Sequence, residues 1–154
     1  MAAYYFDTSA LVKRYAQEAG TAWVMGLTAL AAGHDLYIVR ITGPEMIAAL
    51  FRKVRTGEVT QGDALRAAAN FRADFQAQYQ IVEVTDGLAD RAMTLAEQHG
   101  LRGYDAVQLA AALGLHAVRH MGGLPPMTFV SADSDLNTAA QAEGLIVDDP
   151  MAHP

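Results

Sequence analysis

The sequence predicts an α/β fold with three layers, in which helices cover both faces of a central parallel sheet of four to five strands. Short apolar runs of strand length alternate along the chain with longer segments that have helical periodicity. Strands that alternate with helices in this way form parallel sheets with both faces covered. Turn residues separate the two kinds of segment, which supports the same assignment.

The expected elements follow one another from the N-terminus to the C-terminus. The apolar, β-favouring runs predict strands over residues 3–6, 36–41, 81–84, 127–131 and 145–147. The segments with helical periodicity, most of them rich in Ala and Leu, predict helices over residues 9–18, 44–55, 60–78, 86–99, 104–117 and 134–143. Pro44 stands at the start of one helix, and Gly57 and Gly100 follow the ends of two others. The stretch GGLPP at 122–126 breaks the chain before a strand.

The length of 154 residues predicts a single domain that spans residues 1–154. We find no internal repeat, low-complexity tract or linker between domains. The consecutive helices within about 44–78, joined by TGEVT, indicate a helical hairpin that projects from the sheet and offers a surface for a partner. The alternative is that these helices only cover the sheet.

Composition excludes several classes of function. The chain has no cysteine, which removes disulfides, thiolate zinc sites and a cysteine nucleophile, and is compatible with a reducing cytoplasm. No stretch approaches the roughly 20 apolar residues that span a bilayer, so we expect a cytoplasmic protein without a membrane partner. Eleven Lys and Arg against 17 Asp and Glu give a net charge of -6. Any contact with nucleic acid must therefore rest on local cationic patches.

Four acidic residues occupy equivalent junctions between a strand and a helix. They are Asp7, Glu45, Asp105 and Asp133. Each has a simple local explanation, because short polar and acidic side chains cap or stabilise the first turn of a helix. Thr42 and Glu45, for example, have the spacing of a capping box. The local sequence therefore leaves the choice between capping and chemistry open.

The shared location of these acids favours chemistry. The carboxyl ends of parallel strands meet at one edge of the sheet, where ligands bind near the point at which the strand order reverses. Carboxylates crowded together raise one another's pKa unless a positive charge lies between them, and a divalent cation supplies that charge. Oxygen ligands favour Mg²⁺ or Mn²⁺ over zinc, and such ions suit phosphodiester hydrolysis. The pattern predicts a metal-dependent nuclease.

Three motifs resemble those of PIN-domain ribonucleases, and more narrowly the VapC toxins of bacterial toxin–antitoxin pairs. They are DTSALVKRY from residue 7, RGYDAVQLAAAL from residue 102 and FVSAD from residue 129, and the acid in TGPE after the second strand fits the same order. The resemblance spans residues 4 to about 147, although residues 56–100 match in pattern only. It implies a PIN-like fold and Mg²⁺- or Mn²⁺-dependent endonucleolytic cleavage of RNA. It also implies a homodimer and inhibition by a cognate VapB-like antitoxin.

By the same resemblance, Asp7, Glu45, Asp105 and Asp133 are the metal-binding and catalytic acids. Ser9 is then expected near the ion or its water. Asp135, two residues after Asp133, is an alternative metal ligand, and Asp133 is favoured because it lies closer to the end of the strand.

Three cations near these acids are candidates for holding RNA. Lys13 and Arg14 follow Asp7 by one to two helical turns, and Arg102 precedes Asp105 by three residues. The cluster of Arg52, Lys53 and Arg55 is interpreted instead as a helix-end feature, because cations are favourable at helix C-termini. Since the chain is acidic, we expect an inhibitory partner to bind through a basic or amphipathic segment that presents Arg to the carboxylates.

Two other functions compete with the nuclease. A haloacid-dehalogenase-like phosphatase would use Asp7 as its nucleophile, but it needs a second aspartate two residues later, where this chain has Ser9. A PIN-like binding or assembly module without nuclease activity is the non-enzymatic alternative. The presence of an acid at all four positions argues against it.

Overall fold

The computed structural model describes residues 1–154 and contains one sheet of five parallel strands. The strands are β1 (Ala3–Phe6), β2 (Asp35–Val39), β3 (Gln80–Val82), β4 (Thr128–Val130) and β5 (Ile146–Asp148). Their spatial order is β3-β2-β1-β4-β5, and every neighbouring pair is parallel. The predicted three-layer fold with a parallel sheet is confirmed.

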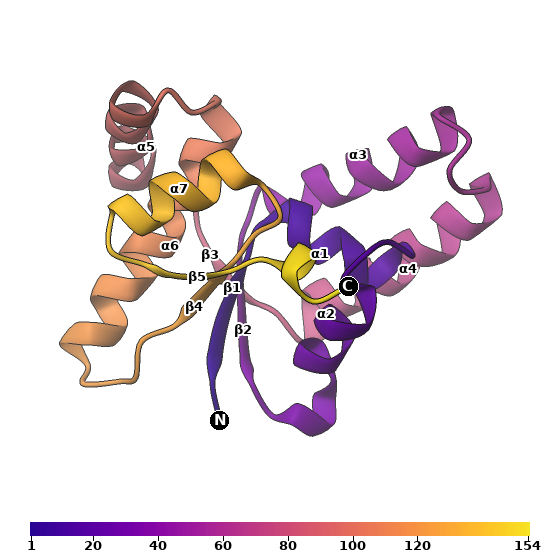
Figure 1. The fold of residues 1–154 in the computed structure, drawn as a ribbon, viewed down its shortest axis with the longest axis horizontal. Coiled ribbons are helices and arrows are strands. Elements are labelled where there is room, and N and C mark those ends of the chain that lie inside the picture. The colour runs from indigo at the N-terminus through magenta and orange to yellow at the C-terminus, as the bar shows by residue number, and fades with distance from the viewer.

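Helices cover both faces of this sheet (Figure 1). The first layer contains α1 (Thr8–Tyr15), α2 (Thr21–Thr28), α3 (Thr42–Arg55) and α4 (Gln61–Ala77). The second layer contains α5 (Asp86–His99), α6 (Gly103–Met121) and α7 (Ser134–Ala142). Two short 3-10 helices, η1 (Leu30–Ala32) and η2 (Pro150–Ala152), complete the elements. None of the helices has both the length and the apolar character needed to cross a membrane.

Alternation along the strands divides the core into two clusters. On β1, Tyr5 packs with α5, α6 and α7, whereas Phe6 packs with α1, α3 and α4. On β2, Ile38 packs in the cluster that contains Phe6, and Val39 packs in the cluster that contains Tyr5. Successive strand residues point to opposite faces of a sheet, so strands buried on both sides contain continuous apolar runs. The runs found in the sequence are therefore those of a doubly covered sheet.

Sequence reasoning missed α2. Its sequence, TAWVMGLT, has no clear polar face and contains a glycine, so no amphipathic pattern reveals it. The residue before it, Gly20, has φ +87°, a left-handed conformation that glycine adopts readily. A Cβ at this position would lie 2.5 Å from the carbonyl oxygen of Pro150. The start of α2 and the C-terminal η2 therefore meet in a contact that requires glycine.

The direction in which the chain is wound reverses at β1. From β1 the chain moves through β2 and β3 to one edge of the sheet, and it later returns to the other side of β1 through β4 and β5. This places a topological switch point between β1 and β4, at the carboxyl ends of the two strands. The backbone N–H of Asp7, just after β1, donates to the carbonyl oxygen of Val130 at 3.1 Å. Two of the expected acidic junctions therefore flank the switch point.

The hairpin of α3 and α4 extends beyond the sheet, as Figure 1 shows on its right-hand side. Met46 and Leu50 on α3, and Ala68 and Phe71 on α4, are buried in the core near the sheet. Arg55 at the far end of α3 is exposed. The hairpin therefore covers the sheet with one end and projects with the other, and its role as a partner surface stays a prediction.

Candidate active site: an acidic pocket at the carboxyl edge of the sheet

Four acids from four separate segments line one cavity of about 210 Å³. Asp7 lies between β1 and α1, Glu45 in the first turn of α3, Asp105 in the first turn of α6, and Asp133 between β4 and α7. The cavity opens at the carboxyl edge of the sheet, next to the switch point. The structure therefore brings together the four acids that the sequence analysis singled out.

Asp7 caps α1 and lines the cavity at the same time. Its Oδ1 accepts a hydrogen bond from the backbone N–H of Ala10 at 3.0 Å, which is the contact of an N-cap residue. The Ser9 hydroxyl lies 2.8 and 2.9 Å from the two carboxylate oxygens, and the Ser131 hydroxyl donates to Oδ2 at 2.9 Å. Capping and a place in the pocket are thus compatible roles of one carboxylate.

Burial raises the pKa of Asp7 from its ordinary value of 3.8 to about 7. Removal from water disfavours the charged form, and the negative charge of Asp105 acts in the same direction. The hydrogen bonds from Ser9, Ala10 and Ser131 lower the pKa and offset part of this rise. Asp7 is therefore an acid whose ionised form requires additional positive charge.

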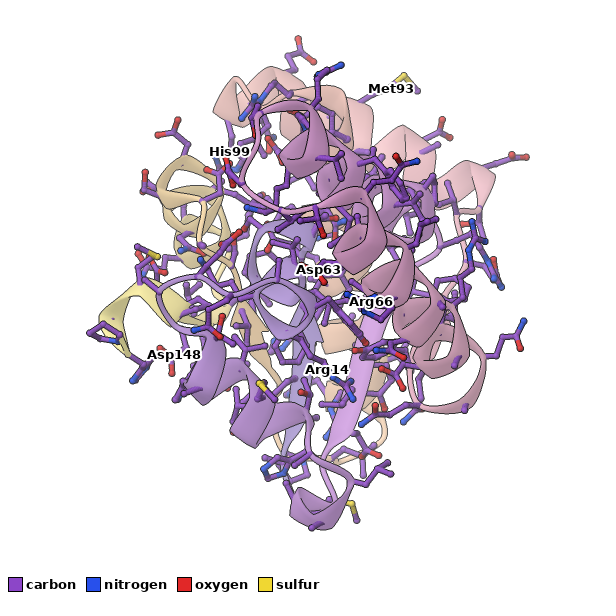
Figure 2. The ribbon with its side chains drawn as sticks, turned by 90° about the vertical axis from the view of Figure 1, so that its right-hand side faces the viewer. Arg14, Asp63, Arg66, Met93, His99 and Asp148 are labelled. Carbon is purple, nitrogen blue, oxygen red and sulfur yellow. The ribbon has the colours of Figure 1, made fainter.

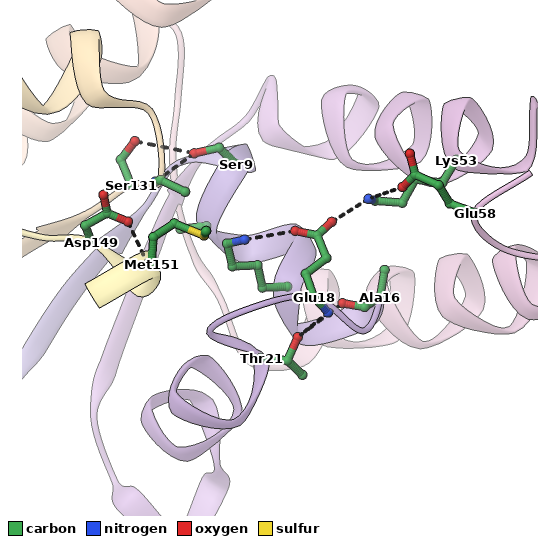
Figure 3. A network of polar contacts seen from close by, with 12 residues as sticks. Ser9, Ala16, Glu18, Thr21, Lys53, Glu58, Ser131, Asp149 and Met151 are labelled. Carbon is green, nitrogen blue, oxygen red and sulfur yellow. Dashed lines mark hydrogen bonds and ion pairs between the residues drawn. The ribbon is translucent and has the colours of Figure 1, made fainter. Parts of the chain in front are cut away.

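Two serines connect the loops on either side of the switch point. The hydroxyl of Ser9 accepts from the backbone N–H of Ala132 at 3.0 Å, and that of Ser131 accepts from the N–H of Asp133 at 3.1 Å. Figure 3 shows the two hydroxyls facing each other, 3.4 Å apart. Each serine therefore orients Asp7 while it fixes the loop that carries Asp133.

Glu45 is held from α6. The expected capping box with Thr42 does not form, because α3 begins at Thr42 itself and its N-cap residue makes no side-chain cap bond. Instead, Nε2 of the buried Gln108 donates to Oε1 of Glu45 at 2.9 Å and to the Thr42 hydroxyl at 3.0 Å. The other end of the amide accepts from the buried Tyr5 hydroxyl at 2.9 Å. Burial raises the pKa of Glu45, and the bonds from Gln108 and Thr8 lower it.

Arg102 bridges the two remaining acids. Its guanidinium lies 3.4 Å from Oδ2 of Asp105 and 3.8 Å from Oδ2 of Asp133. Burial and the charge of Asp133 raise the pKa of Asp105, whereas Arg102 lowers it. Asp133 also caps α7 through the N–H of Leu136 at 3.0 Å. Asp135 does not line the cavity.

Two of the three cations expected to hold RNA are not brought to the pocket. Lys13 is buried in an ion pair with Glu18 at 2.9 Å and does not line the pocket. Arg14, labelled in Figure 2, donates to Gln78 at 2.7 Å and to the Tyr79 hydroxyl at 2.6 Å. Both side chains satisfy carboxylates or hydroxyls of their own chain, because α1 packs against α2 and α4. Of the three cations expected to hold RNA, only Arg102 lines the cavity.

Three further residues of the site were not singled out by sequence reasoning, namely Tyr104, Gln108 and Ser131. Arg52, which was interpreted as a helix-end feature, also lines the cavity. Gln108 follows Asp105 by three residues and Arg52 follows Glu45 by seven, so helical spacing places each on the same face as an acid. Ser131 lies within the motif FVSAD, next to the alanine that precedes Asp133. The signals were present, but each one depends on first knowing which acids matter.

The donor set fits a hard divalent cation. The cavity is lined by four carboxylates and by the hydroxyls of Thr8 and Ser9, and the chain has no cysteine to attract softer metals. No group of three or more Asp, Glu or His side chains is already assembled as a metal cage. Mg²⁺ does not need such a cage, since it is usually held by one or two carboxylates together with water. The raised pKa of Asp7 identifies where positive charge is missing.

Comparisons with known proteins point to one family. The sequence pattern of the PIN domain matches residues 4–141. The protein named Ribonuclease VapC45, from Mycobacterium tuberculosis strain CDC 1551, is 36% identical over 141 residues, which cover 91% of this chain and 90% of the relative. The residues that the PIN-domain pattern matches, 4–141, include all four acids of the pocket.

Solved structures with the same fold are more distant in sequence. PAE2754 from Pyrobaculum aerophilum superposes with a TM-score of 0.61 at 23% identity, covering 95% of this chain and 89% of that one. VapBC2 from Rickettsia felis, solved with a DNA fragment from the promoter, gives a TM-score of 0.61 at 14% identity over 96% of this chain and 98% of that one. These similarities support the fold alone.

Proposed function

This chain belongs to the PIN domain family, and on that basis we propose that it is an endoribonuclease that hydrolyses RNA phosphodiester bonds in its acidic pocket. The observation that carries the proposal is the convergence of Asp7, Glu45, Asp105 and Asp133 on one cavity at the switch point of the sheet. Capping of α1 by Asp7 and of α7 by Asp133 does not require the four acids to meet. A relative that covers nine-tenths of the chain is itself named a ribonuclease.

We propose Mg²⁺ or Mn²⁺ as the cofactor, held by Asp7, Asp105 and Asp133, with Glu45 as a further ligand or as the group that accepts a proton from water. When bound, such an ion activates a water and stabilises the negative charge that develops on the phosphodiester. Ser9 and Ser131 keep both oxygens of Asp7 in a fixed orientation. Gln108 does the same for Glu45, whose pKa is raised by burial, and a higher pKa makes a carboxylate a better proton acceptor.

We further propose that the protein is the toxin of a toxin–antitoxin pair and acts on RNA in the cytoplasm as a homodimer. Its partner is a VapB-like antitoxin. The relative named VapC45 and the spacing of the motifs support this role. The bridge that Arg102 forms between Asp105 and Asp133 illustrates how an arginine pairs with these carboxylates. An antitoxin that presents Arg to the same carboxylates would compete with the metal.

The experiment uses purified protein, free of antitoxin, incubated with total RNA in Mg²⁺, Mn²⁺ or EDTA, with the new RNA ends mapped by sequencing. We expect cleavage only with a divalent ion. Asp105→Asn should reduce the rate by about 100-fold or more, because even the loss of outer partners of a metal site costs 10–100-fold. Titration calorimetry with Mn²⁺ gives a second readout that does not depend on turnover.

Asp90→Asn is the matched control, since Asp90 is an exposed aspartate on α5 outside the pocket. It should cleave RNA and bind Mn²⁺ as the unmodified protein does. Failure of the unmodified protein to cut any RNA with either metal would refute the nuclease. Equal behaviour of Asp105→Asn and Asp90→Asn in both assays would then favour the binding module.

A further inference from the structure

The rim of the acidic pocket carries a free arginine and an exposed tyrosine, on α3 and α6. We propose that these two residues hold the RNA strand across the pocket: Arg52 binds a backbone phosphate, and Tyr104 stacks on the base of a neighbouring nucleotide. The inference rests on the proposed ribonuclease function and names the contacts by which that site takes single-stranded RNA.

Arg52 is the cation of the pocket that has no partner. It lies on α3 two helical turns after Glu45, and its guanidinium makes no hydrogen bond or ion pair. Its neighbour Lys53, in contrast, is paired with Glu18 and with Glu58. Arg102 is paired with two of the pocket acids. An unpaired guanidinium at a site meant for phosphate is available for the bidentate contact that arginine makes with phosphate oxygens.

Arg52 also lines a second cavity, of about 520 Å³, that adjoins the acidic pocket. Ser9, Val12 and Ala49 line both cavities as well, so the two lie side by side along the groove between α1 and α3. Lys13, Glu18 and Lys53 line this second cavity, and the Glu18 carboxylate pairs with both lysines. Figure 3 shows Glu18 reaching toward Lys53. The groove therefore provides a path by which a strand leaves the pocket past Arg52.

Tyr104 lies on the other side of the pocket, directly before Asp105. The residue is 45% exposed, whereas every other Phe, Tyr and Trp of the chain is buried or half-buried. It stacks on no other aromatic ring, and the guanidinium of Arg102 lies 5.3 Å from the centre of its ring. A cation over one part of the ring restrains it without burying it. An exposed, restrained ring beside a phosphate site is a platform on which a base can stack whatever its identity.

The phosphate contact should make affinity depend on salt concentration, and the stacking contact should make it depend on the presence of bases. Binding measurements separate the two. The probes are fluorescein-labelled 10-nucleotide RNAs, oligo(U) and oligo(A), and an abasic ribose-phosphate chain of equal length. Anisotropy is measured in Mg²⁺ with protein that carries Asp7→Asn, so that the probes stay intact. Each rim variant is added to this background.

Arg52→Gln should weaken binding of all three probes by about 10-fold or more, because a charge-assisted bond to phosphate is lost whatever the bases are. The slope of log Kd against log salt concentration should fall by about 0.7, as expected for one phosphate contact on a single strand. Arg55→Gln is the control, since Arg55 is an exposed, unpaired arginine one turn further along α3 and does not line the pocket. It should change neither quantity.

Tyr104→Leu should weaken binding of oligo(U) and oligo(A) by about 5- to 150-fold but leave the abasic probe unchanged, because stacking requires bases. The salt slope should stay the same. Tyr104→Phe, which keeps the ring, should restore binding.

Two results would overturn the inference. One is an equal effect of Arg52→Gln and Arg55→Gln, and the other is an equal effect of Tyr104→Leu on the abasic and base-bearing probes. Cleavage of total RNA by the unmodified protein tests the proposed function separately. Protein that binds the probes as expected but cuts no RNA would support the contacts of Arg52 and Tyr104 and refute the nuclease.

Discussion

The substitution Asp7→Asn should stabilise the metal-free protein at alkaline pH. The folded structure raises the pKa of this carboxyl from 3.8 to about 7, chiefly through burial. The folded chain therefore holds the Asp7 proton more tightly than the unfolded chain. The stability that this proton contributes is fully present below about pH 4 and is lost as the pH rises through about 7.

The size of the effect follows from the same pKa. Each pKa unit corresponds to about 1.4 kcal/mol, so the rise to about 7 sets a ceiling of about 4 kcal/mol for the cost of the buried charge at pH 8. Asparagine carries no charge and still caps a helix. It offers one acceptor oxygen where the carboxylate offers two, and the hydroxyl that loses its acceptor costs about 1–2 kcal/mol.

The expected gain from Asp7→Asn is therefore about 2–3 kcal/mol in the free energy of unfolding at pH 8, and about zero at pH 4.5. For a domain of this length, the gain at pH 8 corresponds to a rise in Tm of about 4–12 °C. The assay is thermal and urea denaturation in EDTA at both pH values. All other groups titrate in both proteins, so the difference between variant and unmodified protein isolates Asp7.

Asp90→Asn serves as the control, because its side chain is exposed. It should show no gain at either pH. Adding Mn²⁺ at pH 8 should raise the Tm of the unmodified protein more than that of Asp7→Asn, because only the carboxylate can pair with the ion. A variant that is less stable than the unmodified protein at pH 8 in EDTA, or whose gain is the same at both pH values, would refute the reasoning.

Two other substitutions test contacts that support the site. Gln108→Leu should lower the free energy of unfolding by about 1–3 kcal/mol, because it leaves the buried Tyr5 hydroxyl without an acceptor. In urea denaturation, the double variant that also carries Tyr5→Phe should recover this stability, and a double variant without recovery would contradict this account. Gly20→Ala should lower Tm by about 4–8 °C, because Gly20 has a positive φ and a Cβ at this position would clash with Pro150. Gly33→Ala should lower Tm less, because Gly33 also has a positive φ but no atom lies within 4 Å of its added Cβ. Equal losses of Tm on thermal denaturation would exclude the clash.

Most of the fold could be predicted from the sequence, because strand and helix patterns in this chain are strong and local. The five apolar runs are the five strands, since a doubly covered parallel sheet needs continuous apolar residues. The helix α2 was missed because it has no polar face, and its start is fixed by Gly20 against Pro150. That contact joins residues far apart in the chain, which no local pattern reveals.

The candidate site also has a part that could be predicted from the sequence and a part that could not. The acids could be predicted because each stands at a junction that the strand pattern locates, and parallel strands bring their carboxyl ends to one edge. Their partners could not be predicted, because Gln108 reaches Glu45 from α6 and Ser131 reaches Asp7 from the loop that follows β4. Lys13 and Arg14 were expected at the pocket from sequence distance alone. The structure turns both toward carboxylates or hydroxyls of the chain instead.

Helix capping and metal chemistry place the same demand on this edge of the sheet. A capping carboxylate must sit where free N–H groups point, and Asp7 and Asp133 meet this demand on α1 and α7. Because β1 and β4 are neighbours at the switch point, the two caps come together. The helices hold the carboxylates in place without neutralising them, so burial raises the pKa of Asp7. Helix capping thus holds two carboxylates close together without neutralising their negative charge, which a divalent cation is suited to do.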